Sequence, residues 1–122
     1  MATPSLFDQQ TVAAWQQLAR EDELVLRNTV LADLSLGLRN SQTGEQVWWS
    51  IREQGIEAGL GERPLVFWLE GDGSAFDDLA RGFPFNRLVR QHRLTVCGDL
   101  RSAVQNWMLL YALTRLTKEL ER

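Results

Sequence analysis

The sequence of 122 residues contains few of the side chains that most often mark catalysis or covalent cross-linking. It has one cysteine, Cys97, and one histidine, His92. A single cysteine excludes an internal disulfide and is typical of a reducing compartment. A zinc site needs about three or four such ligands, so these two residues do not suffice for one. We therefore expect no disulfide framework, no metal centre and no other cofactor.

Long apolar runs and a strong charge of one sign are also missing. No stretch approaches the roughly 20 apolar residues of a membrane span, and the N-terminus lacks the pattern of a signal peptide. The formal net charge is −3, which gives no general attraction to nucleic acid. We expect one cytoplasmic domain over residues 1–122, without a transmembrane segment or a nucleic-acid partner. Tryptophan, in contrast, is abundant, with five residues in this short chain.

The histidine and the cysteine are too far apart to act as a catalytic pair. If residues 93–97 form a strand, a rise of about 3.3 Å per residue separates His92 from Cys97 by roughly 16 Å. A nucleophile and its base need a separation of about 3 Å. Asp77 and Asp78 are adjacent, point about 100° apart on a helix and form no acid–base pair. The sequence therefore predicts no catalytic residue, and an enzyme is the least favoured class of function.

Helical and strand periodicities divide the chain into segments. Helices are expected at residues 5–28 with a break near 19–22, at 74–82, at 84–91 and at 99–121, with Ser5 and Ser74 as N-caps. Strands are expected at 34–38, in the two arms of a hairpin that turns near Gln54, at 64–71 and at 93–98. Helices at both ends of an antiparallel group predict an α+β fold: a five-stranded, mostly antiparallel sheet, helices on one face and a long C-terminal helix.

The expected C-terminal helix carries apolar residues on two opposite faces. Steps of about 100° per residue place Leu100, Ala103, Val104, Trp107 and Tyr111 on one face. The same steps place Leu109, Leu113, Leu116 and Leu120 on the other. One straight helix on one core cannot bury both faces. Either the helix breaks near Met108 within one monomer, or its second face meets a partner subunit, a membrane surface or a mobile lid position.

Residues 74–107 resemble the second half of the sterol carrier protein 2 (SCP2) family. Phe76, Leu79 and Gly82 match the family's helix, and the strand and turn of the form G-K-L-x-I-x-G-D are matched by Leu94, Val96, Gly98 and Asp99. The first half of the chain matches the family in the order of its elements. The resemblance implies an antiparallel sheet with helices across one face. It also implies an apolar tunnel between them for sterols, fatty acids, fatty acyl-CoA or isoprenoid lipids.

The residues expected to line such a tunnel are apolar or aromatic: Leu36, Trp49, Phe76, Leu79, Phe83, Phe85, Leu88, Trp107, Met108 and Tyr111. Each is also compatible with a plain packed core, because pockets and cores share this composition. A partner or lid surface is predicted for Trp48, Trp68, Leu109, Leu113, Leu116 and Leu120. For the two tryptophans, the alternative is that the N-terminal segment covers the outer face of the sheet. A basic cluster, Arg87, Arg90, His92 and Arg93, is either a solvated face or a site for a carboxylate, a phosphate or a headgroup.

Three functions fit this sequence. The first is a carrier of a hydrophobic small molecule. The second is an accessory module that presents a lipid intermediate to biosynthetic enzymes, so a lipid-biosynthetic enzyme or a second copy of the chain would be its protein partner. The third and least favoured is a cavity-type enzyme that orders its substrate by proximity.

Overall fold

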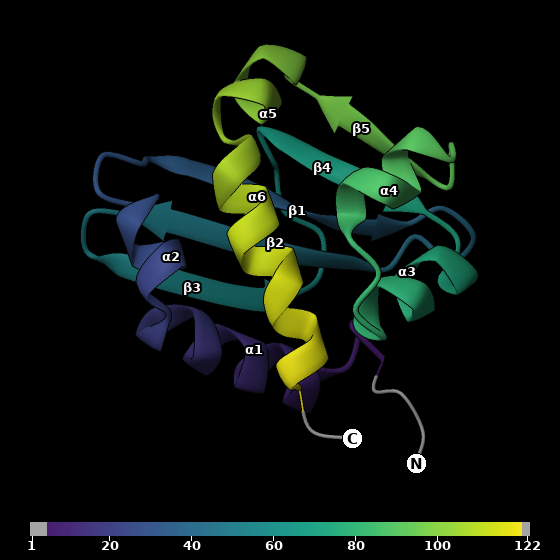
Figure 1. Cartoon of the computed structure of the whole chain (residues 1–122), viewed down its shortest axis with the longest axis horizontal. Coiled ribbons are helices and arrows are strands. Elements are labelled where there is room, and N and C mark those ends of the chain that lie inside the picture. The colour runs from purple at the N-terminus through teal and green to yellow at the C-terminus, as the bar shows by residue number, and fades with distance from the viewer. Residues whose placement is uncertain (1–4, 121–122) are drawn as a thin grey trace.

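A computed structural model describes residues 5–120 as a five-stranded sheet with helices packed against it (Figure 1). The strands are β1 (Leu34–Asn40), β2 (Gln46–Arg52), β3 (Gly55–Leu60), β4 (Phe67–Gly71) and β5 (Leu94–Gly98), in the spatial order β3-β2-β1-β4-β5. β1 and β4 pair in parallel, and the other neighbours pair antiparallel. The predicted α+β fold with a mostly antiparallel sheet is therefore confirmed.

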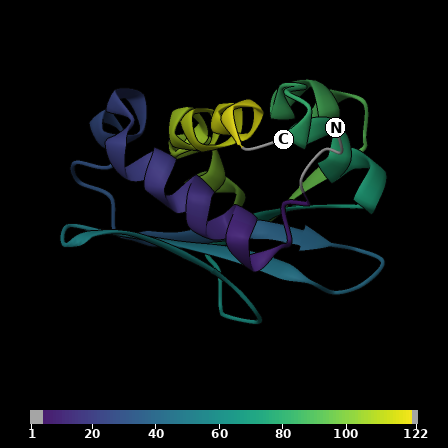
Figure 2. The same ribbon diagram turned by 90° about the horizontal axis from the view of Figure 1, so that it is seen from below.

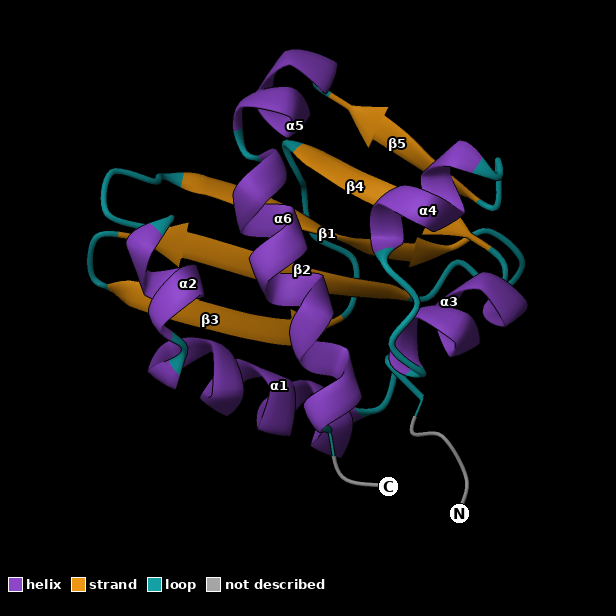
Figure 3. Cartoon of the chain, viewed as in Figure 1, coloured by secondary structure: helices purple, strands orange, loops and turns teal. Residues whose placement is uncertain are grey.

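The helices lie on one face of this sheet, as Figures 2 and 3 show. They are α1 (Gln9–Glu21), α2 (Glu23–Arg27), α3 (Gly73–Ala80), α4 (Phe85–Arg90), α5 (Leu100–Gln105), α6 (Trp107–Thr114) and the 3₁₀ helix η1 (Arg115–Glu119). α6 crosses the middle of the sheet, with α1 and α2 on one side and α3 and α4 on the other. The opposite face carries only the loop 61–66 between β3 and β4 among the residues described.

Aspartates, and not the expected serines, cap the first and third helices. The Asp8 carboxylate accepts hydrogen bonds from two backbone N–H groups of α1, and the Asp72 carboxylate accepts one from α3. A charged cap gains both a hydrogen bond and attraction to the positive end of the helix dipole, which explains why Ser5 and Ser74 are not used. The break expected near residues 19–22 is confirmed at Asp22, which ends α1 and caps α2.

The prediction of one long C-terminal helix is wrong. The chain forms α5, turns at Asn106, continues as α6 and tightens into η1. Asn106 has φ −112° and ψ 23°, and its side-chain amide donates to the carbonyl of Ser102 at 2.8 Å. The break does not bury both apolar faces: of the first face Ala103 is buried, whereas Leu100, Val104 and Tyr111 are 41–71% exposed. It lies two residues before the expected position at Met108.

Side chains of α1 occupy the free edge of β3. The backbone N–H of Ala58 donates to the Gln16 side-chain oxygen at 2.6 Å, and Arg20 Nε donates to the carbonyl of Ile56 at 2.8 Å. A strand edge presents unpaired backbone groups, so these two bonds complete β3 from the side that no strand covers.

Gly37 allows the two central strands to pack closely. It lies opposite Trp48 of β2 and opposite Trp68 of β4. A Cβ at Gly37 would lie 2.2 Å from the Val47 carbonyl oxygen and 2.9 Å from the Leu65 side chain. Backbone cannot move aside as a flexible side chain can, so the position requires glycine.

We expect Gly37→Ala to lower the free energy of unfolding by about 1–3 kcal/mol or more, because overpacking forces strands β1 and β2 apart. The measurement is urea denaturation followed by circular dichroism. Gly73→Ala is the matched control, since a Cβ there meets nothing closer than the Asn40 amide at 3.8 Å. Equal stabilities for wild type and Gly37→Ala would contradict this account of the sheet centre.

Candidate functional site

Most of the predicted tunnel residues form the core between the sheet and the helices. Each of the following is at most 2% exposed: Leu36, Trp49, Phe76, Leu79, Phe85 and Leu88. Leu36 and Trp49 are register partners on β1 and β2, with their side chains toward the helices as expected. The Trp49 ring packs edge-to-face on Trp15 of α1, with centroids 5.1 Å apart. In this conformation, these side chains pack against one another, and their contact with a ligand stays a prediction.

The other predicted ligand residues lie toward the outside of the helical layer. Phe83, Met108 and Tyr111 are 42%, 54% and 41% exposed. Trp107 is half-buried, and its ring lies 4.8 Å from that of Phe85 on α4. The exposed Phe83, Met108 and Tyr111 therefore do not line an interior cavity in this conformation, whereas Trp107 packs against the edge of the core.

The face of α6 that was expected to be exposed is buried, and the face that was expected to line the tunnel is exposed. Leu109, Leu113, Leu116 and Leu120, predicted as a partner or lid surface, are at most 4% exposed and belong to the core. The face that carries Met108 and Tyr111 is exposed instead. The sequence of α6, WMLLYALT, has no charged residue. Hydrophobic periodicity cannot decide which side of such a helix faces the core, because both sides are apolar.

Polar contacts hold the C-terminal end of α6 and the start of η1. Trp15 Nε1 donates to the Leu113 carbonyl at 2.9 Å, in a buried setting. The Thr117 hydroxyl donates to the Leu79 carbonyl at 2.6 Å. Arg115 forms an ion pair with Asp22 between α1 and α2. These contacts connect the C-terminal segment to α1, α2 and α3.

The Asp22 carboxylate is stabilised in its charged form. Burial alone would raise the pKa of Asp22, but hydrogen bonds from the Val25 N–H and from Arg115, with the charge of Arg115, outweigh burial and lower that pKa below its ordinary value. The Asp22 and Arg115 side chains are only 18% and 28% exposed. Water therefore screens this pair less than an ordinary surface ion pair.

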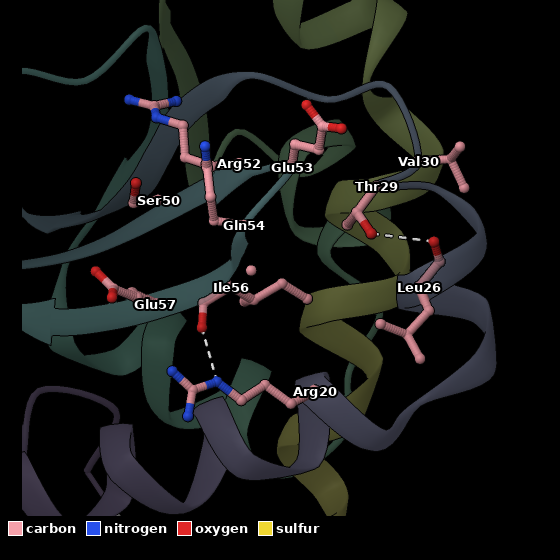
Figure 4. A pocket seen from close by; sticks show the side chains of 11 residues that line it. Arg20, Leu26, Thr29, Val30, Ser50, Arg52, Glu53, Gln54, Ile56 and Glu57 are labelled. Carbon is pink, nitrogen blue, oxygen red and sulfur yellow. Dashed lines mark hydrogen bonds between the residues drawn. The ribbon is translucent and has the colours of Figure 1, made fainter.

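A cleft of about 740 Å³ opens between the α1–α2 region and the β2–β3 hairpin (Figure 4). Leu26, Val30 and Ile56 give it apolar walls, and Arg20 and Glu57 bring charge to it. Arg52, which pairs with Asp33 at 2.8 Å, and Glu53 add further charge at the hairpin. The cleft contains none of the predicted ligand residues. Apolar walls beside charged groups suit an amphipathic molecule.

The outer face of the sheet holds Trp48 and Trp68, both half-buried. The Arg63 guanidinium lies over the Trp48 ring, 3.6 Å from its centroid, and Trp68 Nε1 donates to Glu70 at 3.3 Å. Loop 61–66 covers this region, and the described part of the N-terminal segment, from Ser5 onward, lies on the helical side of the sheet instead. A shallower cleft of about 500 Å³ is lined by Arg39, Gln46, Glu62, Arg63, Pro64, Leu65 and Trp68.

His92 lies in a turn and Cys97 lies in a strand, and the two do not form a site. His92 is exposed in the turn before β5, with a φ of 60°, and Cys97 lies in β5 opposite Trp68. Burial, with a smaller contribution from Glu70, raises the pKa of the Cys97 thiol, which disfavours the reactive thiolate. In the part of the chain that the structure describes, no group of three or more His, Cys, Asp or Glu residues could hold a metal ion.

The basic cluster divides into paired and unpaired members. Arg93 forms an ion pair with Asp78 at 2.7 Å and a hydrogen bond with Ser74. Arg87 lies 5.7 Å from the Phe83 ring centroid, and Arg90 is exposed at the end of α4. The cluster is therefore not one convergent site.

Several residues that position α6 were not singled out in the sequence. They include Trp15, whose indole N–H holds Leu113, and the pair formed by Asp22 and Arg115. The paired residues are 93 positions apart in the sequence. The sequence offered one signal for these contacts. Trp15 lies on the apolar face of an amphipathic helix, and a buried indole N–H needs a hydrogen-bond acceptor.

No protein-family model matches this sequence, and no curated protein matches it significantly. Solved structures do match. A crystal structure of sterol carrier protein 2 has a TM-score of 0.79 at 17% identity, over 95% of this chain and 99% of that chain. The UbiJ-SCP2 ubiquinone synthesis protein has a TM-score of 0.59 at 18% identity, over 86% and 90%. A conserved hypothetical protein from Thermus thermophilus, described as possibly a sterol carrier protein, gives 0.64 at 16%, over 97% and 93%.

The chain therefore has the SCP2-like fold that its resemblance implied. No helix within residues 5–120 combines the length and apolar character needed to cross a bilayer.

The Asp22–Arg115 pair predicts a pH-dependent stability. Asp22→Asn retains an N-cap for α2 but removes the charge, so we expect a loss of about 1–2 kcal/mol in unfolding free energy at pH 7. Because the folded-state pKa lies below the ordinary 3.8, the pair stabilises above that pH and its contribution is lost as the pH falls through the lowered value.

Urea denaturation of both proteins at neutral and acid pH measures this difference. It should shrink toward zero at acid pH. Asp33→Asn is the matched control, because Asp33 is 82% exposed in its pair with Arg52, and it should cost less than about 0.5 kcal/mol. A difference that is the same at both pH values would contradict the assignment.

Proposed function

We propose that this protein binds a hydrophobic small molecule between α6 and the sheet and carries it without chemical change. The main support for this proposal is the composition of α6. This helix has no charged residue, is apolar on both sides and crosses the sheet of an SCP2-like fold. Sterols, fatty acids, fatty acyl-CoA and isoprenoid lipids are the ligand classes that this apolar setting suits. No catalytic residue is part of the proposal.

Binding of this kind requires α6 to move away from the sheet, since the tunnel residues pack together in this conformation. α6 is bounded by the turn at Asn106 and by η1, two points where the regular helix is interrupted. The hydrogen bonds and the ion pair that hold it to α1, α2 and α3 lie at its C-terminal end and in η1, at Leu113, Arg115 and Thr117. We propose that the N-terminal part of α6, at Trp107 and Met108, swings outward about that end.

The energetics of an apolar ligand suit such an opening. Each CH₂ group removed from water contributes about 0.8 kcal/mol, so a long alkyl chain can replace many of the side-chain contacts that opening disrupts. The inner leucines, including Leu109 and Leu113, would then contact the ligand. The outer face of α6 gains no new apolar exposure, because it is already apolar and exposed.

The second candidate is an accessory module that presents a lipid intermediate to a biosynthetic enzyme. The fold shared with the UbiJ-SCP2 ubiquinone synthesis protein over 86% of this chain supports it. With this role we propose a biosynthetic enzyme or a second copy of the chain as the protein partner, and a cytoplasmic location. Purification with a lipid-biosynthetic enzyme from the native source would favour this role over simple transport.

Quenching by a spin-labelled fatty acid tests where a ligand binds. The variant Trp48→Phe/Trp68→Phe/Trp107→Phe retains only Trp15 and Trp49, which are 1% exposed in the core. Doxyl-stearic acid should quench the fluorescence of this variant and saturate at one ligand per chain, because a ligand under α6 lies beside both rings.

Unlabelled stearic acid is the competitor and should restore the fluorescence. Native mass spectrometry of the same sample counts the bound ligand. Stoichiometric binding without quenching would place the ligand elsewhere, with the cleft beside α2 as the next site to examine. Absence of binding in both measurements would overturn the proposed function.

A further inference from the structure

We infer that the outer face of α5 and α6 docks onto an anionic lipid bilayer. The face carries four large apolar side chains with 41–71% exposure, here called the outer stripe: Leu100, Val104, Met108 and Tyr111. Leu100 and Val104 are four residues apart on α5, and Met108 and Tyr111 are three apart on α6, so each pair lies on one side of its own helix. Single exposed apolar residues are ordinary, but four of them on two adjoining helices indicate an interaction surface.

The charge of the chain is divided between two regions in a way that the net value conceals. Residues 79–118 contain one acidic residue, Asp99, and seven basic ones: Arg81, Arg87, Arg90, Arg93, Arg101, Arg115 and Lys118. Residues 1–78 contain thirteen acidic residues and five arginines. The basic region includes α4, α5 and α6, so the outer stripe lies in the positively charged part of an acidic protein.

Three of these cations are free to meet an external anion. Arg87 and Arg90 on α4 and Arg101 on α5 are exposed, and no carboxylate among residues 5–120 lies within ion-pair distance of them. Arg81, Arg93 and Arg115 differ, because each is paired with an aspartate. α4 and α5 both pack beside β5, and α4 also contacts α6, so the helices that carry the unpaired cations adjoin those that carry the stripe.

Charge complementarity selects the bilayer over a second copy of the chain. A two-fold interface brings the same patch of both copies together, which would gather two sets of Arg87, Arg90 and Arg101 in one interface without an opposing charge. An anionic leaflet supplies the opposite charge, and its acyl region accepts the apolar side chains to a depth of about 5–10 Å. Apolar residues between cations are the pattern of an interfacial helix.

This docking goes beyond the proposed lipid cavity and does not depend on it, since it uses only residues on the outside of the helical layer. It would place the outer side of α6, the element proposed to move, in contact with the membrane surface. A protein that binds vesicles but takes up no doxyl-stearic acid would retain this inference and lose the proposed function.

Co-sedimentation with unilamellar vesicles tests the inference. The full chain should bind vesicles of equal parts phosphatidylcholine and phosphatidylglycerol and bind pure phosphatidylcholine much more weakly. Binding should fall as salt rises from 0.1 to 1 M, because the Debye length shrinks from about 10 to about 3 Å. Arg87→Gln/Arg90→Gln should weaken binding about 25-fold, at roughly fivefold for each cation near an anionic surface.

The apolar part is tested by Val104→Glu/Met108→Glu, which should abolish vesicle binding and leave the circular dichroism spectrum unchanged. Val66→Glu is its matched control, on the loop over the opposite face. Arg39→Gln/Arg63→Gln, also on that face, is the control for charge. Both controls should bind vesicles as the wild type does.

Failure of the wild type to bind anionic vesicles would overturn the inference. The inference would also be overturned if Val66→Glu lost as much vesicle binding as Val104→Glu/Met108→Glu. A wild type that sediments as a dimer, and a Val104→Glu/Met108→Glu variant that is monomeric but still binds vesicles, would instead make this face an interface between copies.

Discussion

The pairing of β1 with β2 on one side and with β4 on the other, with Gly37 between Trp48 and Trp68, is the contact on which the fold depends. The pairing of β1 with β4 joins the β1–β2–β3 meander to the β4–β5 pair. Trp48 and Trp68 lie beside Gly37 on the outer face, and Leu36 and Trp49 lie on the inner face. Because side chains alternate along a strand, a slip of one residue would exchange these faces. The helices can share one core only because this register keeps the apolar face on one side.

The sequence was sufficient for the class of fold because the strands alternate clearly. Leu34, Leu36 and Leu38 are buried on β1 as the period of two predicts, and the hairpin turns where Gln54 and Gly55 indicate. Helix caps were harder to predict. Serine and aspartate both cap helices and occur near the same helix starts, and only the three-dimensional course of the chain shows which one is used.

The candidate site was less predictable for a different reason. Phe76, Leu79 and Phe85 have the composition of a pocket wall and of a packed core, and the sequence cannot distinguish the two. The exchange of the two faces of α6 has the same origin. Leu113 is inside because Trp15 and the sheet lie beneath it, and Met108 is outside because no element among residues 5–120 covers it. Those neighbours come from distant parts of the chain, where local periodicity carries no information.

The side chains that α1 places along β3 limit how this molecule can associate with others. A strand from another chain could add to β3 only by displacing Gln16 from the Ala58 N–H and Arg20 from the Ile56 carbonyl. At the far edge, β5 has five residues and ends at Gly98, whose φ of 88° turns the backbone out of the extended conformation. One edge is occupied and the other is short, so growth of the sheet from chain to chain is disfavoured. The protein can therefore expose apolar side chains on its helices without also offering a template for fibril-like assembly.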